Sequence, residues 1–287
     1  RVLFAFLFIG GVGAFILLIL SFFPGNKLIA VRLNWDKQLL KRLLMQAAPY
    51  GFAFLCTALY RQCDISLIAI LRPDFQIQNA HYGFVQRSLD MAYLFPTFLL
   101  NSTLPLLSAR RKKGEDTRGL AGKTFLATLL LSSICFLFAV LWARPLMKLL
   151  TNDMYLAHDG MPGSDTALMI LSGSMFMNGI VVYAFYSLLT AHRWQGLVFT
   201  LSVGAALSLG LNVWLIPSMG FVGASITSVI THVFLGLVLL PQSVRALPIR
   251  LRASELLRWA TFTALIAAGL VLFRPLLTSD LRTAAML

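Results

Sequence analysis

Residues 43–71 read LLMQAAPYGFAFLCTALYRQCDISLIAIL, an apolar stretch that carries Arg61 and Asp64 in its interior. A membrane-spanning helix needs about 20 predominantly apolar residues, and this stretch exceeds that length. Charged side chains are expensive inside a bilayer, so a protein retains them where they pair or where they act on a substrate. This Arg-x-x-Asp motif is therefore the first candidate for a functional site.

A second apolar stretch, residues 80–107, carries the same spacing at Arg87 and Asp90. An antiparallel helical hairpin that turns midway between the two motifs would place Arg61 at the depth of Asp90. It would also place Asp64 at the depth of Arg87. The spacing therefore predicts either two interhelical salt bridges or a charged wall that faces a cavity.

The composition is that of an integral membrane protein. The 287 residues are 58% hydrophobic and only 12% charged, whereas soluble domains are about 45–50% apolar and about 25% charged. The sequence lacks the ten-residue alternating segments of a membrane β-barrel, and helices are the other way to satisfy backbone polar groups in lipid. We expect an all-α fold, a polytopic transmembrane helical bundle.

About eight spans are expected from the apolar stretches. They are Val2–Phe23, Leu43–Leu71, Ala80–Leu107, Gly122–Leu150, Asp165–Thr190, Gln195–Ile216, Phe221–Leu240 and Leu256–Leu276. The chain begins at Arg1, directly before a span, without an initiator Met or the features of a signal peptide. We therefore expect a fragment of a larger transporter-sized protein. The alternative is a complete eight-span protein whose Met was trimmed.

The basic residues predict the orientation of the chain in the membrane. The net charge is +13, and most basic residues fall in one set of alternate loops, which is expected to be cytoplasmic. These loops are 24–42, 108–123, 191–195 and 243–258. Juxtamembrane basic residues suit anionic lipid headgroups, so we expect no nucleic-acid partner. The last loop either lies along the inner membrane surface or is a plain connection.

The candidate binding residues are the charged residues inside the spans and their polar neighbours. They are Arg61, Asp64, Arg87 and Asp90, with Tyr60 and Gln62 beside them as possible sugar contacts. The alternative is a structural ion-pair network that holds the hairpin together. His232 is interpreted as a proton site or as a satisfied core residue, and Asn212 as an interhelical hydrogen-bonding residue.

The sequence contains no motif of an enzyme. It has no nucleophile elbow, HExxH, nucleotide-binding loop or dinucleotide fingerprint, and no metal-ligand spacing. We therefore expect no catalytic residue, no metal and no cofactor. Because the cytoplasmic loops are too short for an ATPase domain, any transport must use an ion gradient, the membrane potential or the substrate gradient.

Three short runs of sequence carry a resemblance to a known family. The run NVWLIPSMGFVGAS, residues 212–225, resembles the late helical hairpin of bacterial polysaccharide flippases. These are the O-antigen and teichoic-acid exporter type of the multidrug/oligosaccharidyl-lipid/polysaccharide exporter superfamily. Ser225 departs from the usual second alanine. The runs Arg61-x-x-Asp64-Ile65 and Tyr82-Gly83 with Arg87 and Leu104–Ser108 are also similar to that family.

The resemblance implies a MATE-like fold of two six-helix lobes, often with two further helices. Residues 1–39 would be the last helix of the first lobe and a cytoplasmic linker. Residues 40–242 would form the six-helix second lobe, and residues 243–287 a linker and an additional C-terminal helix. The orientation predicted from the basic loops agrees with this arrangement.

The resemblance also implies a function. Such proteins move a lipid-linked sugar, usually on undecaprenyl diphosphate, across the bacterial inner membrane by alternating access. Arg61 and Arg87 would meet the diphosphate or acidic sugars, since guanidinium groups bind such anions bidentately. Asp64 and Asp90 would orient the arginines or carry a coupling H⁺ or Na⁺. Envelope glycosyltransferases or a polymerase would be partners.

Other functions fit the same residues. Within the superfamily they are a multidrug/cation antiporter and a peptidoglycan-precursor flippase. A different class is a membrane-embedded sugar polymerase or glycosyltransferase, which would use the carboxylates of the outer loop, Asp153, Asp159 and Asp165. A further class is a non-transporting membrane scaffold, which leaves the buried charges without a purpose.

Overall fold

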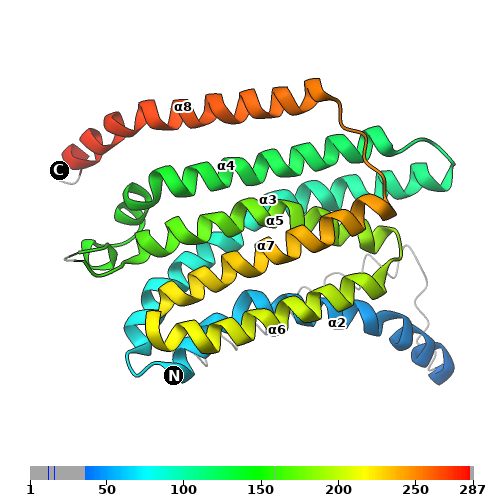
Figure 1. The fold of residues 1–287 in the computed structure, drawn as a ribbon, viewed down its shortest axis with the longest axis horizontal. Coiled ribbons are helices and arrows are strands. Elements are labelled where there is room, and N and C mark those ends of the chain that lie inside the picture. The colour runs from blue at the N-terminus through cyan, green and yellow to red at the C-terminus, as the bar shows by residue number, and fades with distance from the viewer. Residues whose placement is uncertain (1–11, 13–15, 17–35, 159, 285–287) are drawn as a thin grey trace. The chain divides into compact units, whose positions relative to one another are not determined.

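The computed structural model describes residues 12, 16, 36–158 and 160–284. Over these residues the chain is all-α, with seven long helices and one short 3₁₀ helix (Figure 1). The helices are α2 (Lys37–Leu71), α3 (Phe75–Lys112), α4 (Arg118–Leu150), η1 (Asp153–Tyr155), α5 (Ser164–Thr190), α6 (Trp194–Met219), α7 (Phe221–Ala246) and α8 (Ala253–Ala284). The chain divides into two compact units, residues 1–46 and 47–287.

Six helices are long and apolar enough to cross a membrane, so the protein is a multi-pass membrane protein. They are α2, α4, α5, α6, α7 and residues 253–273 of α8. The expected span 80–107 is helical within α3, but α3 is not among the six, because polar residues and prolines interrupt its apolar sequence along its length. The expected span 2–23 lies outside the described residues.

Helix α5 lies at the centre of the bundle. It packs against α4, α7 and α3, while α6 packs on α7 and α8 packs on α4 (Figure 1). Small residues let α4 and α5 approach closely, because a Cβ added at Gly179 would clash with the Ser132 hydroxyl. The Trp142 indole of α4 donates a hydrogen bond to the Leu270 carbonyl of α8 at 3.0 Å.

The turn between α6 and α7 consists of Gly220 alone. Its φ of 59° lies in the left-handed region, which glycine adopts without the strain of a Cβ. A Cβ there would also clash with the Gln78 side-chain oxygen of α3. This turn joins the sixth and seventh expected spans, and it contacts a third helix.

Residues 247–252 form the connection between α7 and α8. Helix α7 continues to Ala246, beyond the expected end at Leu240, and the Leu247 side chain is buried in the core. The Arg250 amide donates to the Arg118 carbonyl at 3.1 Å. The connection is thus short and packed against the start of α4, and its position along the inner membrane surface stays a prediction.

Candidate functional site

The α2–α3 hairpin turns around Pro73. Symmetric pairing of the two motifs would need a turn midway between residues 61 and 90, which is later in the chain. Helix α2 ends at Leu71, and α3 begins at Phe75. The Gln86 side-chain amide donates to the Arg61 carbonyl at 3.1 Å, which sets the register of the two helices. A turn centred on residue 73 places Asp64 at the level of Tyr82, and it places Arg61 about one helical turn from Asp90.

The pairing of Arg61 with Asp90 is confirmed. Arg61 Nη2 lies 2.9 Å from Asp90 Oδ1, and the two side chains are 24% and 26% exposed. The long arginine side chain spans the register difference. Its guanidinium carbon also lies 4.6 Å from the centroid of the Tyr93 ring, a cation–π contact. The guanidinium is thus held by an anion and a ring, while about a quarter of the Arg61 side chain remains exposed.

The expected pairing of Asp64 with Arg87 does not form. Asp64 is buried and accepts hydrogen bonds from the Tyr82 hydroxyl at 2.6 Å and the Asn212 side-chain amide at 2.7 Å. The register difference is the same for both pairs, but Arg87 lies on the exposed side of α3, so its side chain does not reach Asp64. Asn212 of α6 therefore makes the interhelical hydrogen bond that the sequence indicated, and Asp64 joins three helices.

Arg87 is exposed on α3. Within the described residues its side chain makes no hydrogen bond or ion pair. The buried side of α3 is formed by Tyr82, Gln86, Leu89 and Tyr93, at spacings of three and four residues. Arg87 lies outside this stripe, because one residue along a helix turns the side chain by about 100°.

The two neighbours of the first motif have different surroundings. Tyr60 is buried, and its ring packs edge-on against the imidazole of His232 at 5.5 Å between centroids. Gln62 is exposed. Its side chain is thus accessible, whereas the Tyr60 ring belongs to the core. Their sugar-binding role stays a prediction.

His232 of α7 lies deep in the bundle between two tyrosines. Its centroid is 5.5 Å from that of Tyr60 and 6.1 Å from that of Tyr93. Nδ1 lies 2.8 Å from the Ser228 carbonyl, while Nε2 is buried and has no hydrogen-bond partner among the described residues. Sequence reasoning did not connect this histidine with the motifs. The available signal was its position as a titratable residue inside a span.

The outer-loop carboxylates do not converge on one point among the described residues. Asp153 pairs with Lys148 at 3.5 Å, and Asp165 accepts a hydrogen bond from the Ala157 amide at 2.9 Å. Asp165 is buried at the start of α5, whereas Asp153 is exposed. Asp159 lies outside the described residues.

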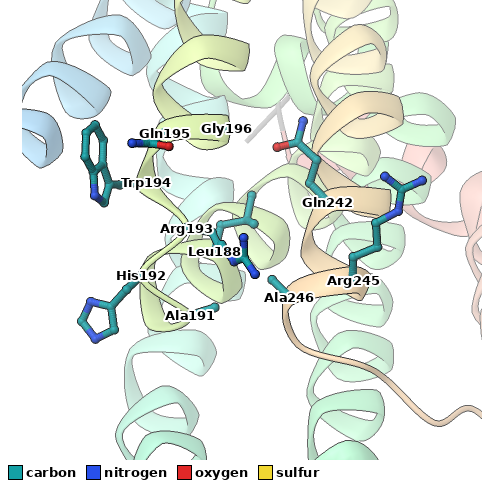
Figure 2. Close-up of a pocket in the computed structure, with 10 residues that line it drawn as sticks. All are labelled: Leu188, Ala191, His192, Arg193, Trp194, Gln195, Gly196, Gln242, Arg245 and Ala246. Carbon is teal, nitrogen blue, oxygen red and sulfur yellow. The ribbon is translucent and has the colours of Figure 1, made fainter.

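A cavity of about 690 Å³ lies between the α5–α6 turn and the end of α7 (Figure 2). Arg193 and Gln195 come from the turn and the start of α6, and Gln242 and Arg245 come from α7. The loop that contains Arg193 was predicted to be cytoplasmic. The sequence did not predict that residues of α7 would complete a basic cavity there.

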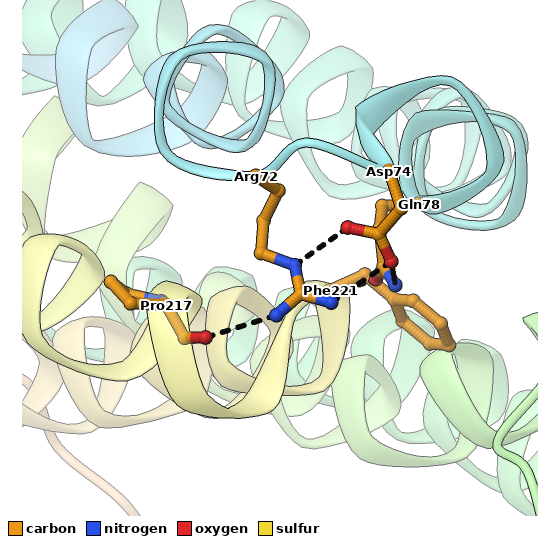
Figure 3. Close-up of polar contacts among 5 residues, drawn as sticks. All are labelled: Arg72, Asp74, Gln78, Pro217 and Phe221. Carbon is orange, nitrogen blue, oxygen red and sulfur yellow. Dashed lines mark hydrogen bonds and ion pairs between the residues drawn. The ribbon is translucent and has the colours of Figure 1, made fainter.

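A polar cluster joins the α2–α3 turn to the α6–α7 turn (Figure 3). Arg72 donates to both carboxylate oxygens of Asp74 at 2.8 and 2.9 Å and to the Pro217 carbonyl at 2.9 Å. Gln78 donates to Asp74 at 2.8 Å and accepts from the Phe221 amide at 3.0 Å. We call these five residues the turn clasp.

The Arg72 guanidinium, which donates hydrogen bonds to Asp74, lowers the pKa of that carboxyl to about 2. The clasp fixes the end of the α2–α3 hairpin against α6 and α7, and it thereby supports the register that pairs Arg61 with Asp90.

Comparison of the chain with protein-family models, with curated proteins and with solved structures finds no match.

Proposed function

We propose that the protein is a flippase for a sugar linked to undecaprenyl diphosphate in the bacterial inner membrane. Arg87 is the observation that carries the proposal. Its guanidinium is exposed on a long helix beside the exposed apolar side chains of Phe84 and Met91. A lipid-facing arginine at this place would be costly, so the side chain needs a polar surrounding or an anionic partner.

The Arg61–Asp90 pair supports the same reading. Its side chains are about a quarter exposed, so an anion can reach the guanidinium without dismantling the core. A diphosphate can exchange with the Asp90 carboxylate because both are anionic acceptors for guanidinium. Arg61 and Arg87 would then hold the headgroup, while Asp90 would hold Arg61 in place between transport cycles.

The proposal includes a further group of helices, about the size of one lobe, that faces α2 and α3. The headgroup would cross the membrane by alternating access in a polar cavity between these two parts. Coupling to H⁺ or Na⁺ and association with envelope glycosyltransferases or a polymerase belong to the same proposal. The charge distribution supports an orientation with loops 24–42, 108–123, 191–195 and 243–258 in the cytoplasm.

One observation favours a second candidate, a multidrug/cation antiporter of the same superfamily. Asp64 is a buried carboxylate that accepts hydrogen bonds from neutral donors and forms no ion pair within the described residues. Such a group can bind a proton or a small cation inside a membrane protein.

The test is flipping of a fluorescent lipid-linked oligosaccharide in proteoliposomes that contain the full-length protein. We expect Arg87→Ala to slow flipping at least about tenfold, since a charge-assisted hydrogen bond contributes about 1.5–3 kcal/mol. Arg87→Lys should retain part of the activity. Arg111→Ala, which removes the same charge from the end of the same helix, is the matched control and should flip normally.

Normal flipping by both Arg61→Ala and Arg87→Ala would show that the site assignment is wrong. The antiporter is tested in the same vesicles with a cationic dye and an imposed proton or sodium gradient. Gradient-driven dye efflux that Asp64→Asn abolishes, without flipping of the lipid-linked sugar, would favour the antiporter over the flippase.

A further inference from the structure

We propose that the cavity between the α5–α6 turn and the end of α7 binds the phosphate group of an anionic phospholipid headgroup. The cavity, of about 690 Å³, has Arg193 on one side and Arg245 on the other. This site is separate from the Arg61 and Arg87 region and does not depend on the proposed transport function.

The backbone fixes the position of Arg193. The Arg193 amide donates to the Leu188 carbonyl at 3.0 Å, and the His192 amide donates to the Leu189 carbonyl at 3.1 Å. These two hydrogen bonds, with His192 at a φ of 55°, close α5 in a Schellman motif. Arg193 therefore stands at a defined place directly before α6 begins at Trp194.

Gln242 forms the polar wall of the cavity on α7. Its Nε2 donates to the Thr200 hydroxyl at 3.1 Å, which fixes the amide between α6 and α7. The amide extends toward the start of α6, and a Cβ added at Gly196 would lie 2.6 Å from Gln242 Oε1 (Figure 2). Glycine at position 196 thus lets the two helices share this polar wall.

The electrostatics of the cavity favour an anion. Arg193 and Arg245 are both exposed, and within the described part of the chain neither side chain forms an ion pair or hydrogen bond. No Asp or Glu is among the residues that line the cavity. The first turn of α6 adds the positive end of a helix dipole. The Arg193 guanidinium can bind the oxygens of a phosphate, and the Arg245 side chain, which extends away from α6 in Figure 2, adds a second positive charge at the end of α7.

The location favours a lipid as the source of the phosphate. Trp194 is the first residue of α6, a candidate membrane span, and its side chain is 38% exposed. Exposed tryptophans at the ends of membrane helices lie at the level of the headgroups. In Figure 2 the Trp194 ring projects away from α7. The cavity is therefore expected to open at the membrane surface, on the side that the basic loops predict to be cytoplasmic.

The experiment measures binding of the full chain in zwitterionic nanodiscs to phosphatidylglycerol, titrated in place of phosphatidylcholine, by native mass spectrometry. We expect the double variant Arg193→Gln/Arg245→Gln to weaken phosphatidylglycerol binding by more than about 25-fold, since two basic residues near a membrane surface contribute a factor of about five each and a direct charge-assisted hydrogen bond to the phosphate adds to this loss. Arg193→Lys/Arg245→Lys should lose less, because the charge remains.

The matched control is Arg250→Gln/Arg252→Gln, which removes the same charge from the α7–α8 connection outside the cavity. It should lose only the general attraction of basic residues to an anionic surface and bind clearly better than the cavity variant. Competition by millimolar inorganic phosphate would support the phosphate site and identify a soluble source, whereas resistance to phosphate would support the lipid. Equal losses in the two glutamine double variants would overturn the proposal, as would equal binding of phosphatidylcholine and phosphatidylglycerol.

Discussion

The two Arg-x-x-Asp motifs have the same spacing but different surroundings in the folded chain. In the first motif, Arg61 forms an ion pair and a cation–π contact, and Asp64 is buried in a hydrogen-bonded network. In the second motif, Asp90 accepts the ion pair, while Arg87 is exposed. One motif is thus fully engaged within the bundle, and the other leaves a cation on its surface.

The difference shows that the spacing of the charged residues sets their depth along the helices. The register and rotation of the packed helices determine which residues they contact. The turn at Pro73 shifts the hairpin register, and the stripe of Tyr82, Gln86, Leu89 and Tyr93 sets the rotation of α3. The shift is the same for both pairs, so the difference comes from the rotation of α3, which leaves Arg87 outside the buried stripe. Arg61 therefore reaches Asp90, while Asp64 meets Tyr82.

The largest expected effect on stability concerns Asp64, the buried carboxylate of the first motif. Asp64→Ala leaves the Tyr82 hydroxyl buried without its acceptor, and it leaves the Asn212 amide only a 3.5 Å contact with the Ser208 hydroxyl. A buried donor that loses its acceptor costs about 1–3 kcal/mol. We expect the free energy of unfolding in detergent micelles to fall by about 3 kcal/mol, measured by denaturant titration. Asp64→Asn is the control and should lose less, because it still accepts from Tyr82. Equal losses in both variants would contradict the role of Asp64 as the acceptor.

A double-mutant cycle on Arg61 and Asp90 sharpens the comparison between the two motifs. The pair is about a quarter exposed, so we expect a coupling energy of about 1 kcal/mol, between the values of surface and buried pairs. The matched cycle on Arg87 and Asp90, which share one helix, should give a coupling near zero. A larger coupling in the second cycle would mean that Asp90 pairs with Arg87 in solution.

A pH titration tests whether the turn clasp supports the hairpin register. Since the pKa of Asp74 is lowered in the folded state to about 2 from its ordinary value of 3.8, the carboxylate contributes stability that is present above pH 3.8. This contribution is lost as the pH falls toward about 2. We expect the difference in melting temperature between the wild type and Asp74→Asn to narrow over that range. A constant difference would show that the Arg72–Asp74 contact is not formed.

The smallest expected effect on stability concerns Arg87, the exposed arginine of the second motif. Arg87→Ala should change the free energy of unfolding by less than about 0.5 kcal/mol, because exposed side chains without partners contribute little to stability. The same denaturant titration measures it. A loss above about 1 kcal/mol would show that Arg87 has a structural partner, and it would remove the main support for its role in binding.

Much of the fold follows from local sequence. The expected spans 122–150, 165–190 and 195–216 lie within α4, α5 and α6 and differ from their bounds by at most a few residues. Hydropathy and length suffice for such helices, because each satisfies its own backbone hydrogen bonds. The prediction was less accurate for 80–107, where polar residues leave a helix that is not apolar enough to count as a candidate span.

The candidate site was predicted in part. Both motifs were found because charged residues stand out in apolar stretches, and the partner of Arg61 followed from hairpin geometry. The partners of Asp64 could not be predicted, since Asn212 is distant in sequence and contacts it only after α6 packs against α2. The turn clasp was missed for the same reason, because Arg72 meets Pro217 through tertiary structure alone.

The sequence by itself determined that this is an all-α membrane protein, where its main helices lie, and which charged residues they contain. These properties depend on composition and on hydrogen bonds within each segment. Only the tertiary structure decided that Asp64 is buried, that Arg87 is exposed, and that Arg193 and Arg245 line one cavity. Those outcomes depend on the register and rotation of packed helices, which are set jointly by residues far apart in the chain.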